Sequence, residues 1–297
     1  MAVNLGGKIA FCVGATSGIG RGVAKRLAEM NASVCIAARN KQAGLELVNE
    51  LKSINPSGTY ESVQCEATSM KSIDKACKDF TNVYGKLNYL VMTQGKGSVD
   101  GRTETSEGID QKLALNYYGR IQCIQSLEST LKKTATKEDV RVLSIFSGGV
   151  HSVYDKLDDL PLKNNYTLQN AANAAGMYTD LAFDQLSLNY GDARVSFIHS
   201  APGIVNTNFS ANLPFPLNYA AYLFAPFAMT PEECAKIQID NALLGAHMGL
   251  TKEGKSGFHL MTRKGEEAQR TKLHNDATRA AVWNHTIETL NAALTAK

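Results

Sequence analysis

The chain begins with an apolar run that gives way to an amphipathic segment. Residues 8–14 read KIAFCVG, a β-branched and apolar run that ends in a glycine, and apolar side chains then recur every three or four positions from Ile19 to Met30. That spacing places side chains on one face of a helix, whereas a short continuous apolar run is typical of a buried strand. The pattern therefore predicts a strand, a turn and a helix.

The same alternation continues along most of the chain. Parallel strands need crossover connections, which helices supply, so this order predicts an α/β fold with a doubly wound parallel sheet of the Rossmann type. We expect strands at 8–14, 33–38, 61–65, 87–92, 140–146 and 195–199, helices at 19–30, 42–53, 70–84 and 107–131, and a further helix that begins near Tyr166.

The last part of the chain extends this pattern. Residues 230–297 predict a helix from Pro231, a short strand at 257–261 and a final helix that contains Trp283. No linker rich in Pro, Gly or Ser and no repeat separates them from the preceding units. The sequence therefore predicts one domain over 1–297, with 230–297 as C-terminal additions.

Composition and charge narrow the class of protein. The chain has 297 residues, of which 44% are hydrophobic and 20% charged, and this is the composition of a folded soluble protein rather than a disordered one. Its 31 Lys and Arg face 28 Asp and Glu, and the cations are scattered, so a nucleic acid is not an expected partner.

The six cysteines carry no metal or disulfide signature. They form no C-x-x-C pair and have no histidine at a spacing suited to zinc, which predicts buried free thiols and no metal site. Residues 1–8 also lack the basic start and apolar stretch of a signal peptide. We therefore expect a reducing, cytoplasmic location.

One apolar stretch, residues 213–229, has the hydropathy of a membrane segment. It is shorter than the roughly 20 apolar residues that a spanning helix needs, and Pro214, Pro216 and Pro226 interrupt it. We expect residues 204–229 to form an apolar loop that covers a lipophilic small-molecule substrate, with core packing or peripheral membrane contact as the alternatives.

A glycine-rich turn, residues 14–20, lies between the first strand and the first helix and reads GATSGIG. Backbone N–H groups and the helix dipole can hold a pyrophosphate there; a tight turn without a ligand is the alternative. The G-x-x-x-G-x-G spacing resembles the cofactor motif of the short-chain dehydrogenase/reductase family. The resemblance implies a nicotinamide cofactor held by Gly14, Thr16, Ser17, Gly18, Ile19 and Gly20.

The second strand ends in Ala38, Arg39 and Asn40, without the acidic residue that would bind a ribose 2′-hydroxyl. A guanidinium at this place can bind a 2′-phosphate through charge-assisted hydrogen bonds, so the sequence favours NADP(H) over NAD(H), with Arg39 and Asn40 as cofactor residues. A solvated surface arginine is the alternative. Glu66, which follows the third strand, resembles the family's acidic residue beside the adenine.

Two later segments resemble the family in part. The family has N-N-A-G after the fourth strand, whereas residues 92–95 read MTQG and keep only the glycine. Residues 199–207 read HSAPGIVNT and resemble H-P-G-x-V-x-T with two extra residues; His199 itself is at least as well explained as a structural polar residue. The implied cofactor contacts are Gly95, Pro202, Gly203 and Thr207.

Two polar residues resemble groups that surround the reacting atoms in this family. Asn116 in LALNYYG matches the helix asparagine that supports a proton-relay water. Ser147 ends the fifth strand, where a doubly wound sheet opens toward its ligand, and it looks like the substrate-orienting serine. Ser144 is the rival, but it lies earlier on the opposite face of the strand and is expected to pack there.

The expected Y-x-x-x-K motif is imperfect. The run YTLQNAAN from Tyr166 resembles the Y-x-x-S-K-x-A-N run of retinol-dehydrogenase-like members, with Asn170 in place of the lysine. The resemblance makes Tyr166 the acid/base candidate on the same helix face as Asn170, which would bond the ribose. Tyr178 fits worse, because Ala182 four positions later can neither carry charge nor donate a hydrogen bond.

The absent lysine changes the expected chemistry. An ammonium stabilises tyrosinate, and the unperturbed pKa of tyrosine is about 10. Carbonyl reduction is affected less than alcohol oxidation, because the tyrosine then starts protonated. The sequence thus predicts an NADP(H)-dependent oxidoreductase that reduces a lipophilic ketone or aldehyde, and the alternative is an NADP(H)-binding sensor or scaffold with little turnover.

Overall fold

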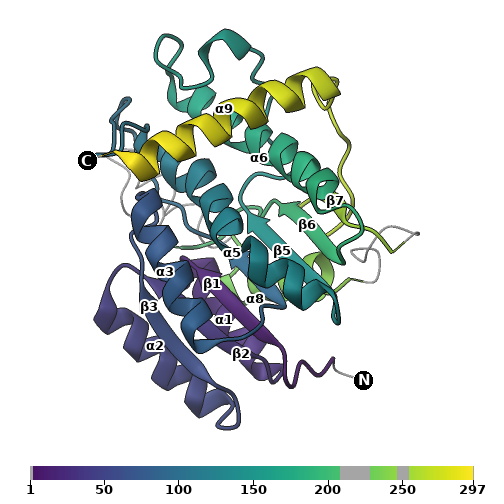
Figure 1. The fold of residues 1–297 in the computed structure, drawn as a ribbon. Coiled ribbons are helices and arrows are strands. Elements are labelled where there is room, and N and C mark those ends of the chain that lie inside the picture. Colours follow the sequence, from purple (N-terminus) through teal and green to yellow (C-terminus); the bar gives the residue numbers. More distant parts are fainter. Residues whose placement is uncertain (1–2, 208–227, 246–253, 297) are drawn as a thin grey trace.

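The sheet has seven parallel strands in the order β3-β2-β1-β4-β5-β6-β7 (Figure 1). The structure is a computed structural model that describes residues 3–207, 228–245 and 254–296. The strands are β1 (Ile9–Val13), β2 (Ser33–Ala38), β3 (Tyr60–Gln64), β4 (Tyr89–Met92), β5 (Val140–Ile145), β6 (Val195–Ser200) and β7 (Gly257–Met261). This confirms the predicted doubly wound fold.

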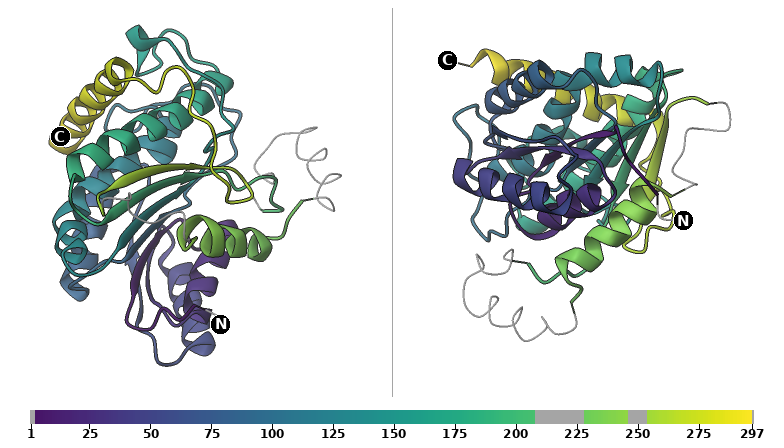
Figure 2. Two further views of the ribbon diagram at one scale, coloured as in Figure 1. Left: turned by 90° about the vertical axis from the view of Figure 1, so that its right-hand side faces the viewer. Right: turned by 90° about the horizontal axis from the view of Figure 1, so that it is seen from below.

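Helices cover both faces of the sheet (Figure 2). Along β1 the side chains alternate, so that Phe11 and Val13 join one buried cluster while Ala10 and Cys12 join the other. The first cluster lies under α3 (Met70–Val83), α5 (Gly119–Ala135), α6 (Leu168–Tyr190) and α9 (Asp276–Thr295). The second lies under α1 (Gly18–Glu29), α2 (Lys41–Ile54) and α8 (Pro231–Ile237) with the π-helix η5 (Gln238–Leu243).

Successive strands are added on one side of β1 as far as β3, and from β4 onward they are added on its other side. β1 and β4 pair with each other. β2 and β3 lie on the far side of β1, whereas β5, β6 and β7 lie on the far side of β4. The helices that follow β1 and β4, α1 and α5, therefore lie on opposite faces of the sheet. In doubly wound sheets this divergence opens the crevice in which ligands bind.

The helix expected at 107–131 is divided, and it begins later than predicted. Glu107 instead caps α3, where its carboxylate accepts from Ser69 Oγ and from the backbone N–H of Met70. Asp110 caps the short helix α4 (Gln111–Leu113), which leads through the π-helix η1 (Ala114–Tyr118) into α5. A wide π turn inside a helix frequently marks a functional position, and this one carries Asn116.

Several smaller predictions can be compared with the structure. All six cysteines are free and buried, as expected. Among the described helices, none has the length and apolar character needed to cross a membrane. Most of the predicted covering loop at 204–229, namely residues 208–227, lies outside the described residues. Its described ends are joined by a bridge between Val205 and Met229.

Candidate active site

The glycine turn after β1 is packed too closely for larger residues. Gly14 has φ +82°, and a Cβ there would lie 2.6 Å from the backbone nitrogen of Gln94, while a Cβ at Gly20 would lie 2.4 Å from the carbonyl oxygen of Gly14. Ser17, the N-cap of α1, makes no side-chain capping bond, so it leaves the first helical N–H groups available to a ligand. The side chain of Thr207 reaches the same turn beside Gly18.

The residues predicted to bind the adenosine end follow β2 and β3 at the same edge. Ala38 is buried, and Arg39 and Asn40 are exposed after it. The side chain of Asn40 accepts from the N–H of Ala43 at 3.1 Å and so caps α2. One carboxylate oxygen of Glu66 accepts from the backbone N–H and the hydroxyl of Thr68, at 3.2 and 3.0 Å.

A buried arginine links β4 to β5 at the place where the family's N-N-A-G is missing. Arg120 is 1% exposed and donates to the carbonyl oxygens of Met92 (2.9 Å) and Gln94 (2.7 Å) and to Ser144 Oγ (2.7 Å). Ser144 therefore packs inside the sheet. Burial lowers the pKa of Arg120 to about 9. Sequence reasoning did not single out Arg120; its only signal was a cation in an otherwise apolar helix segment.

Buried polar atoms of one residue after β4 and of three predicted site residues have no hydrogen-bond partner among the described residues. They are the amide of Gln94, Oδ1 of Asn116, Oγ of Ser147 and the phenol oxygen of Tyr166. Asn116 Oδ1 lies 3.8 Å from the Cβ position of Gly95. Buried polar atoms normally have a partner, so these positions fit a site that is completed by a bound molecule or water.

Tyr166 and Asn170 do not share a helix face as predicted. α6 begins at Leu168, after Thr167 has capped it by accepting from the N–H of Asn170. Tyr166 therefore precedes the helix. The amide of Asn170 donates to the carbonyl of Asn165 at 2.7 Å and so closes the turn. A cation does approach Tyr166, but it is Lys112 of α4, whose Nζ lies 5.8 Å from the ring centroid.

Comparisons with known proteins identify the family. The model of the short chain dehydrogenase family matches residues 8–156. The oxidoreductase AN1596 of Emericella nidulans is 31% identical over 317 residues, which cover 96% of this chain and 93% of the relative. The chain belongs to the short-chain dehydrogenase family. The human polyprenol dehydrogenase is 26% identical over 286 residues, covering 95% and 84%.

Solved short-chain dehydrogenases share the fold. The hydroxysteroid dehydrogenase of Escherichia coli has a TM-score of 0.62 at 18% identity and covers 89% of this chain and 98% of its own. Pseudomonas aeruginosa RhlG, solved with NADP, has a TM-score of 0.61 at 22% identity, with coverage of 86% and 95%. At these identities the likeness concerns the fold.

This short-chain dehydrogenase places a glycine opposite Ser147. A Cβ at Gly176 of α6 would lie 2.5 Å from Ser147 Oγ and 2.6 Å from the ring of His151. The loop after β5 thus lies directly on α6, and Ser152 N–H also donates to Asn173 Oδ1 at 3.2 Å. Because Gly176 has no side chain, the ring of His151 fits beside Ser147 at this place.

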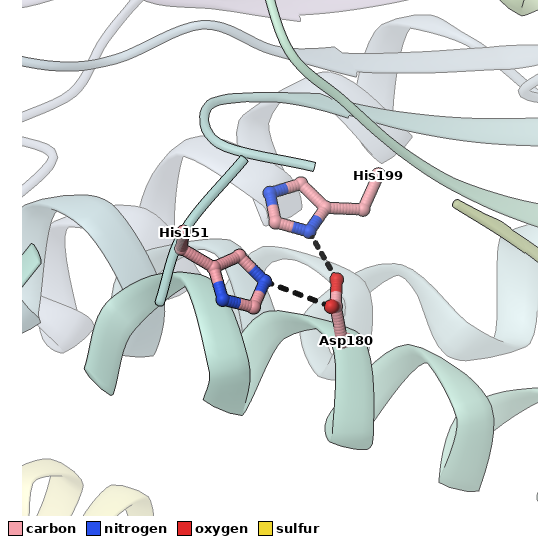
Figure 3. Close-up of side chains that lie close together, drawn as sticks. All are labelled: His151, Asp180 and His199. Carbon is pink, nitrogen blue, oxygen red and sulfur yellow. Dashed lines mark hydrogen bonds and ion pairs between the residues drawn. The ribbon is translucent and has the colours of Figure 1, made fainter. Parts of the chain in front are cut away.

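Three histidines donate to one buried carboxylate beneath this loop, and Figure 3 shows two of them, His151 and His199, with Asp180. Asp180 of α6 accepts from His199 Nδ1 (2.5 Å), His151 Nε2 (2.9 Å) and His274 Nε2 (3.1 Å). All four side chains are at most 3% exposed. His199 Nε2 in turn accepts from the N–H of Ser147 at 3.2 Å. The carboxylate therefore fixes His151 directly and the backbone of Ser147 through His199.

The charges in this cluster follow from burial and hydrogen bonding. Burial opposes ionisation of Asp180, but the three histidine partners outweigh it and hold the pKa of Asp180 well below its usual value. Burial also disfavours a charged His151, yet Asp180 raises the pKa of His151 above its usual value. Burial lowers the pKa of His199, which Asp180 only partly offsets. The cluster thus keeps Asp180 ionised and favours protonation of His151 over that of His199.

Sequence reasoning missed most of this cluster. His199 was noted only as a polar strand residue, and His151, Asp180 and His274 were not singled out. An aspartate within the apolar stretch AAGMYTDLAF and a histidine at the end of a buried strand were the available signals. Buried ionisable residues of this kind are seldom without partners.

Proposed function

We propose that this short-chain dehydrogenase is an NADP(H)-dependent oxidoreductase that reduces a lipophilic ketone or aldehyde. The observations that carry the proposal are the glycine turn packed against the end of β4 and the buried unpartnered polar atoms of Asn116, Ser147 and Tyr166. The relatives' names include oxidoreductases and dehydrogenases, which favours turnover over a sensor or scaffold role.

The residues present fit a dinucleotide. The turn from Gly14 to Gly20, including Thr16, Ser17, Gly18 and Ile19, would hold the pyrophosphate, and Glu66 would lie beside the adenine. Arg39 with Asn40 would bind the 2′-phosphate, which supports NADP(H) over NAD(H). The nicotinamide end would contact Gly95, Pro202, Gly203 and Thr207. When bound, the reduced cofactor supplies the hydride.

In this proposal the chain's own residues orient the carbonyl and supply a proton. Ser147 Oγ, which has no partner among the described residues, hydrogen-bonds the carbonyl oxygen, and Asn116 supports a relay water. The assignments of Tyr166 as proton donor and of Asn170 as a ribose ligand stay predictions, because Tyr166 precedes the helix and the Asn170 amide already donates to Asn165.

We also propose a substrate class, a domain organisation and a location. We propose one domain over 1–297, in which the apolar segment 204–229 covers the substrate. A relative named polyprenol dehydrogenase supports a lipophilic substrate. That the chain lies in the retinol-dehydrogenase-like branch stays a proposal. Six buried free cysteines fit a cytoplasmic location.

Replacement of Arg39 tests the cofactor proposal. Loss of a charge-assisted contact to the 2′-phosphate should weaken NADPH binding roughly 10- to 100-fold in Arg39→Ala and leave NADH binding within about twofold. Fluorescence titration with both cofactors measures this. Lys52→Ala is the matched control, because Lys52 is an exposed cation in the last turn of α2. Equal losses for NADPH and NADH would contradict selective recognition of the phosphate.

A further inference from the structure

The backbone of Ser147 is fixed by a side chain rather than by the sheet. The pairing of β5 with β6 ends at the N–H of Phe146, which donates to the carbonyl oxygen of Ser200 at 2.8 Å. The following N–H, that of Ser147, donates at 3.2 Å to Nε2 of His199. The imidazole of His199 thus takes the place of a strand carbonyl for one more residue at the end of β5.

The turn that begins at Ser147 is packed closely on the same strand. The carbonyl oxygen of Ser147 accepts from the N–H of Val150 at 3.1 Å, so both backbone polar groups of Ser147 are bonded. A Cβ at Gly148 would lie 2.3 Å from the carbonyl oxygen of His199. The hydroxyl of Ser147, by contrast, is buried and has no partner among the described residues. The backbone of Ser147 is therefore held, while its hydroxyl is left available to a ligand.

The hydrogen bonds of His199 determine its tautomer. A backbone N–H can only donate, so Nε2 of His199 accepts and carries no proton. Nδ1 therefore carries the proton of a neutral ring, and it donates to Oδ1 of Asp180 at 2.5 Å. Burial favours the same neutral form, because it lowers the pKa of His199. Asp180 thus orients the ring that in turn holds Ser147.

This tautomer does not suit a metal ligand. His151, Asp180 and His199 place possible ligand atoms within 4.8 Å of one another. A histidine that binds a metal donates a hydrogen bond from its other ring nitrogen, whereas Nε2 of His199 accepts from Ser147. Both ring nitrogens of His199 are already engaged, one as a donor and one as an acceptor. The pair of His199 and Asp180 is therefore better explained as a support for Ser147.

We propose that His199, oriented by Asp180, is a positioning residue that holds Ser147 Oγ in place for the substrate carbonyl. The inference rests on the proposed carbonyl reduction, in which Ser147 bonds the carbonyl oxygen. His199 acts through the backbone of Ser147, and it neither gives nor takes a proton in the reaction. Because a misplacement of about 1 Å can lower turnover roughly 100-fold, one positioning bond is enough to affect the rate.

Two substitutions of His199 separate its two hydrogen bonds. The amide of asparagine reaches the place of Nδ1, and that of the longer glutamine reaches the place of Nε2. His199→Asn therefore keeps a donor for Asp180 and loses the acceptor for Ser147, whereas His199→Gln does the reverse. We expect kcat for carbonyl reduction to fall roughly 10- to 100-fold in His199→Asn and to stay within about fivefold of the wild type in His199→Gln.

The stability of the two variants should follow the opposite order. His199→Gln removes a donor from the buried carboxylate of Asp180, so its urea midpoint should fall more than that of His199→Asn. A residue with only a structural role would lose turnover and stability in the same order. That order, or equal turnover in both folded variants, would overturn the proposal. His285→Asn on α9 is the matched control and should leave turnover unchanged.

A double-mutant cycle tests whether His199 acts through Ser147. If the imidazole serves to place the Ser147 hydroxyl, removal of that hydroxyl in Ser147→Ala makes His199→Asn silent. The double variant should then have the kcat of Ser147→Ala within about twofold. Independent roles would instead multiply the two losses, and multiplied losses would overturn the proposal.

A further readout in the free protein does not depend on turnover. In ¹⁵N spectra at pH 7, His199 should show a protonated Nδ1 and an unprotonated Nε2, and the loss of these signals in His199→Asn identifies them. A protonated Nε2 would overturn the proposal. So would a stoichiometric metal in the purified protein that is lost in His199→Asn.

These outcomes separate the inference from the proposed function. Carbonyl reduction by the wild type, with multiplied losses in the double variant, would reject the positioning role and retain the oxidoreductase. NADPH binding without reduction of any lipophilic ketone or aldehyde would reject the oxidoreductase, and with it the positioning role.

Discussion

The two ends of the candidate site are built from different parts of the chain. At the glycine turn, a single contiguous segment packs its backbone against the end of β4, and no side chain larger than hydrogen fits at Gly14 or Gly20. At Ser147, by contrast, side chains converge from the loop after β5, from α6, from β6 and from the segment before α9, and Figure 3 shows the first three of these, His151, Asp180 and His199.

This difference has a physical consequence. A backbone-built site tolerates change in its surroundings as long as the turn keeps its glycines, because it needs only N–H groups and close approach. A side-chain cluster in a buried, low-dielectric place depends on every partner, because an unpaired buried charge is costly. Substitutions in the Asp180 cluster should therefore affect stability more than substitutions in the turn.

Asp180→Asn should have the largest effect. The substitution removes the anion to which three buried rings donate and which favours protonation of His151. Breaking a buried ion pair in this way costs about 3–5 kcal/mol of unfolding free energy. Urea unfolding at pH 7 measures this. In the control Asp192→Asn, where the side chain is 92% exposed, the change should stay within about 0.5 kcal/mol.

The difference in stability between the wild type and Asp180→Asn should depend on pH in a direction that the pKa of Asp180 determines. The pKa of Asp180 is lower in the folded state than in the unfolded state, where it is about 3.9. The contribution of Asp180 to the free energy of unfolding is therefore fully present above the unfolded-state pKa and is lost as the pH falls toward the folded-state pKa. The stability difference between wild type and Asp180→Asn should therefore narrow as the pH falls below about 4. A difference that is constant down to pH 2 would mean that Asp180 is not ionised in the fold.

Gly14→Ala should have the next largest effect, at the backbone-built end. Gly14 has φ +82°, and an added Cβ would meet the backbone of Gln94. Left-handed backbone and overpacking together should cost about 2–3 kcal/mol, and NADPH binding should weaken at least tenfold because the turn must shift. Thermal unfolding and cofactor titration measure the two effects.

Gly85→Ala is the matched control for the turn. No atom lies within 4 Å of its Cβ position, and its φ is not in the left-handed range. Its stability should change by less than about 0.5 kcal/mol, with unaltered NADPH binding. If both alanine variants bind NADPH like the wild type, the turn is only a structural turn.

The contrast between the two ends also explains how far sequence could predict this molecule. The order of strands and helices and the glycine turn are local patterns, so periodicity and spacing were enough to predict them. Asp180 and its three partners are far apart in sequence, and the alternation of apolar and polar residues does not report which buried groups meet. The Tyr166 to Asn170 spacing was misleading, because Thr167 caps the helix between them.

Arg120→Lys probes a link that sequence reasoning did not find. Its guanidinium bridges the carbonyls of Met92 and Gln94 and the hydroxyl of Ser144, which a single ammonium cannot reach together. Buried acceptors left unpaired should cost about 1–3 kcal/mol.

In Arg194→Lys the cost should be smaller than about 0.5 kcal/mol, because Arg194 and Asp139 form an exposed pair. Urea unfolding of both variants measures the contrast. If Arg120→Lys leaves the free energy of unfolding unchanged, water satisfies those carbonyl oxygens. The ends of β4 and β5, and with them the spacing of Gly95 and Ser147, would then depend on strand pairing alone.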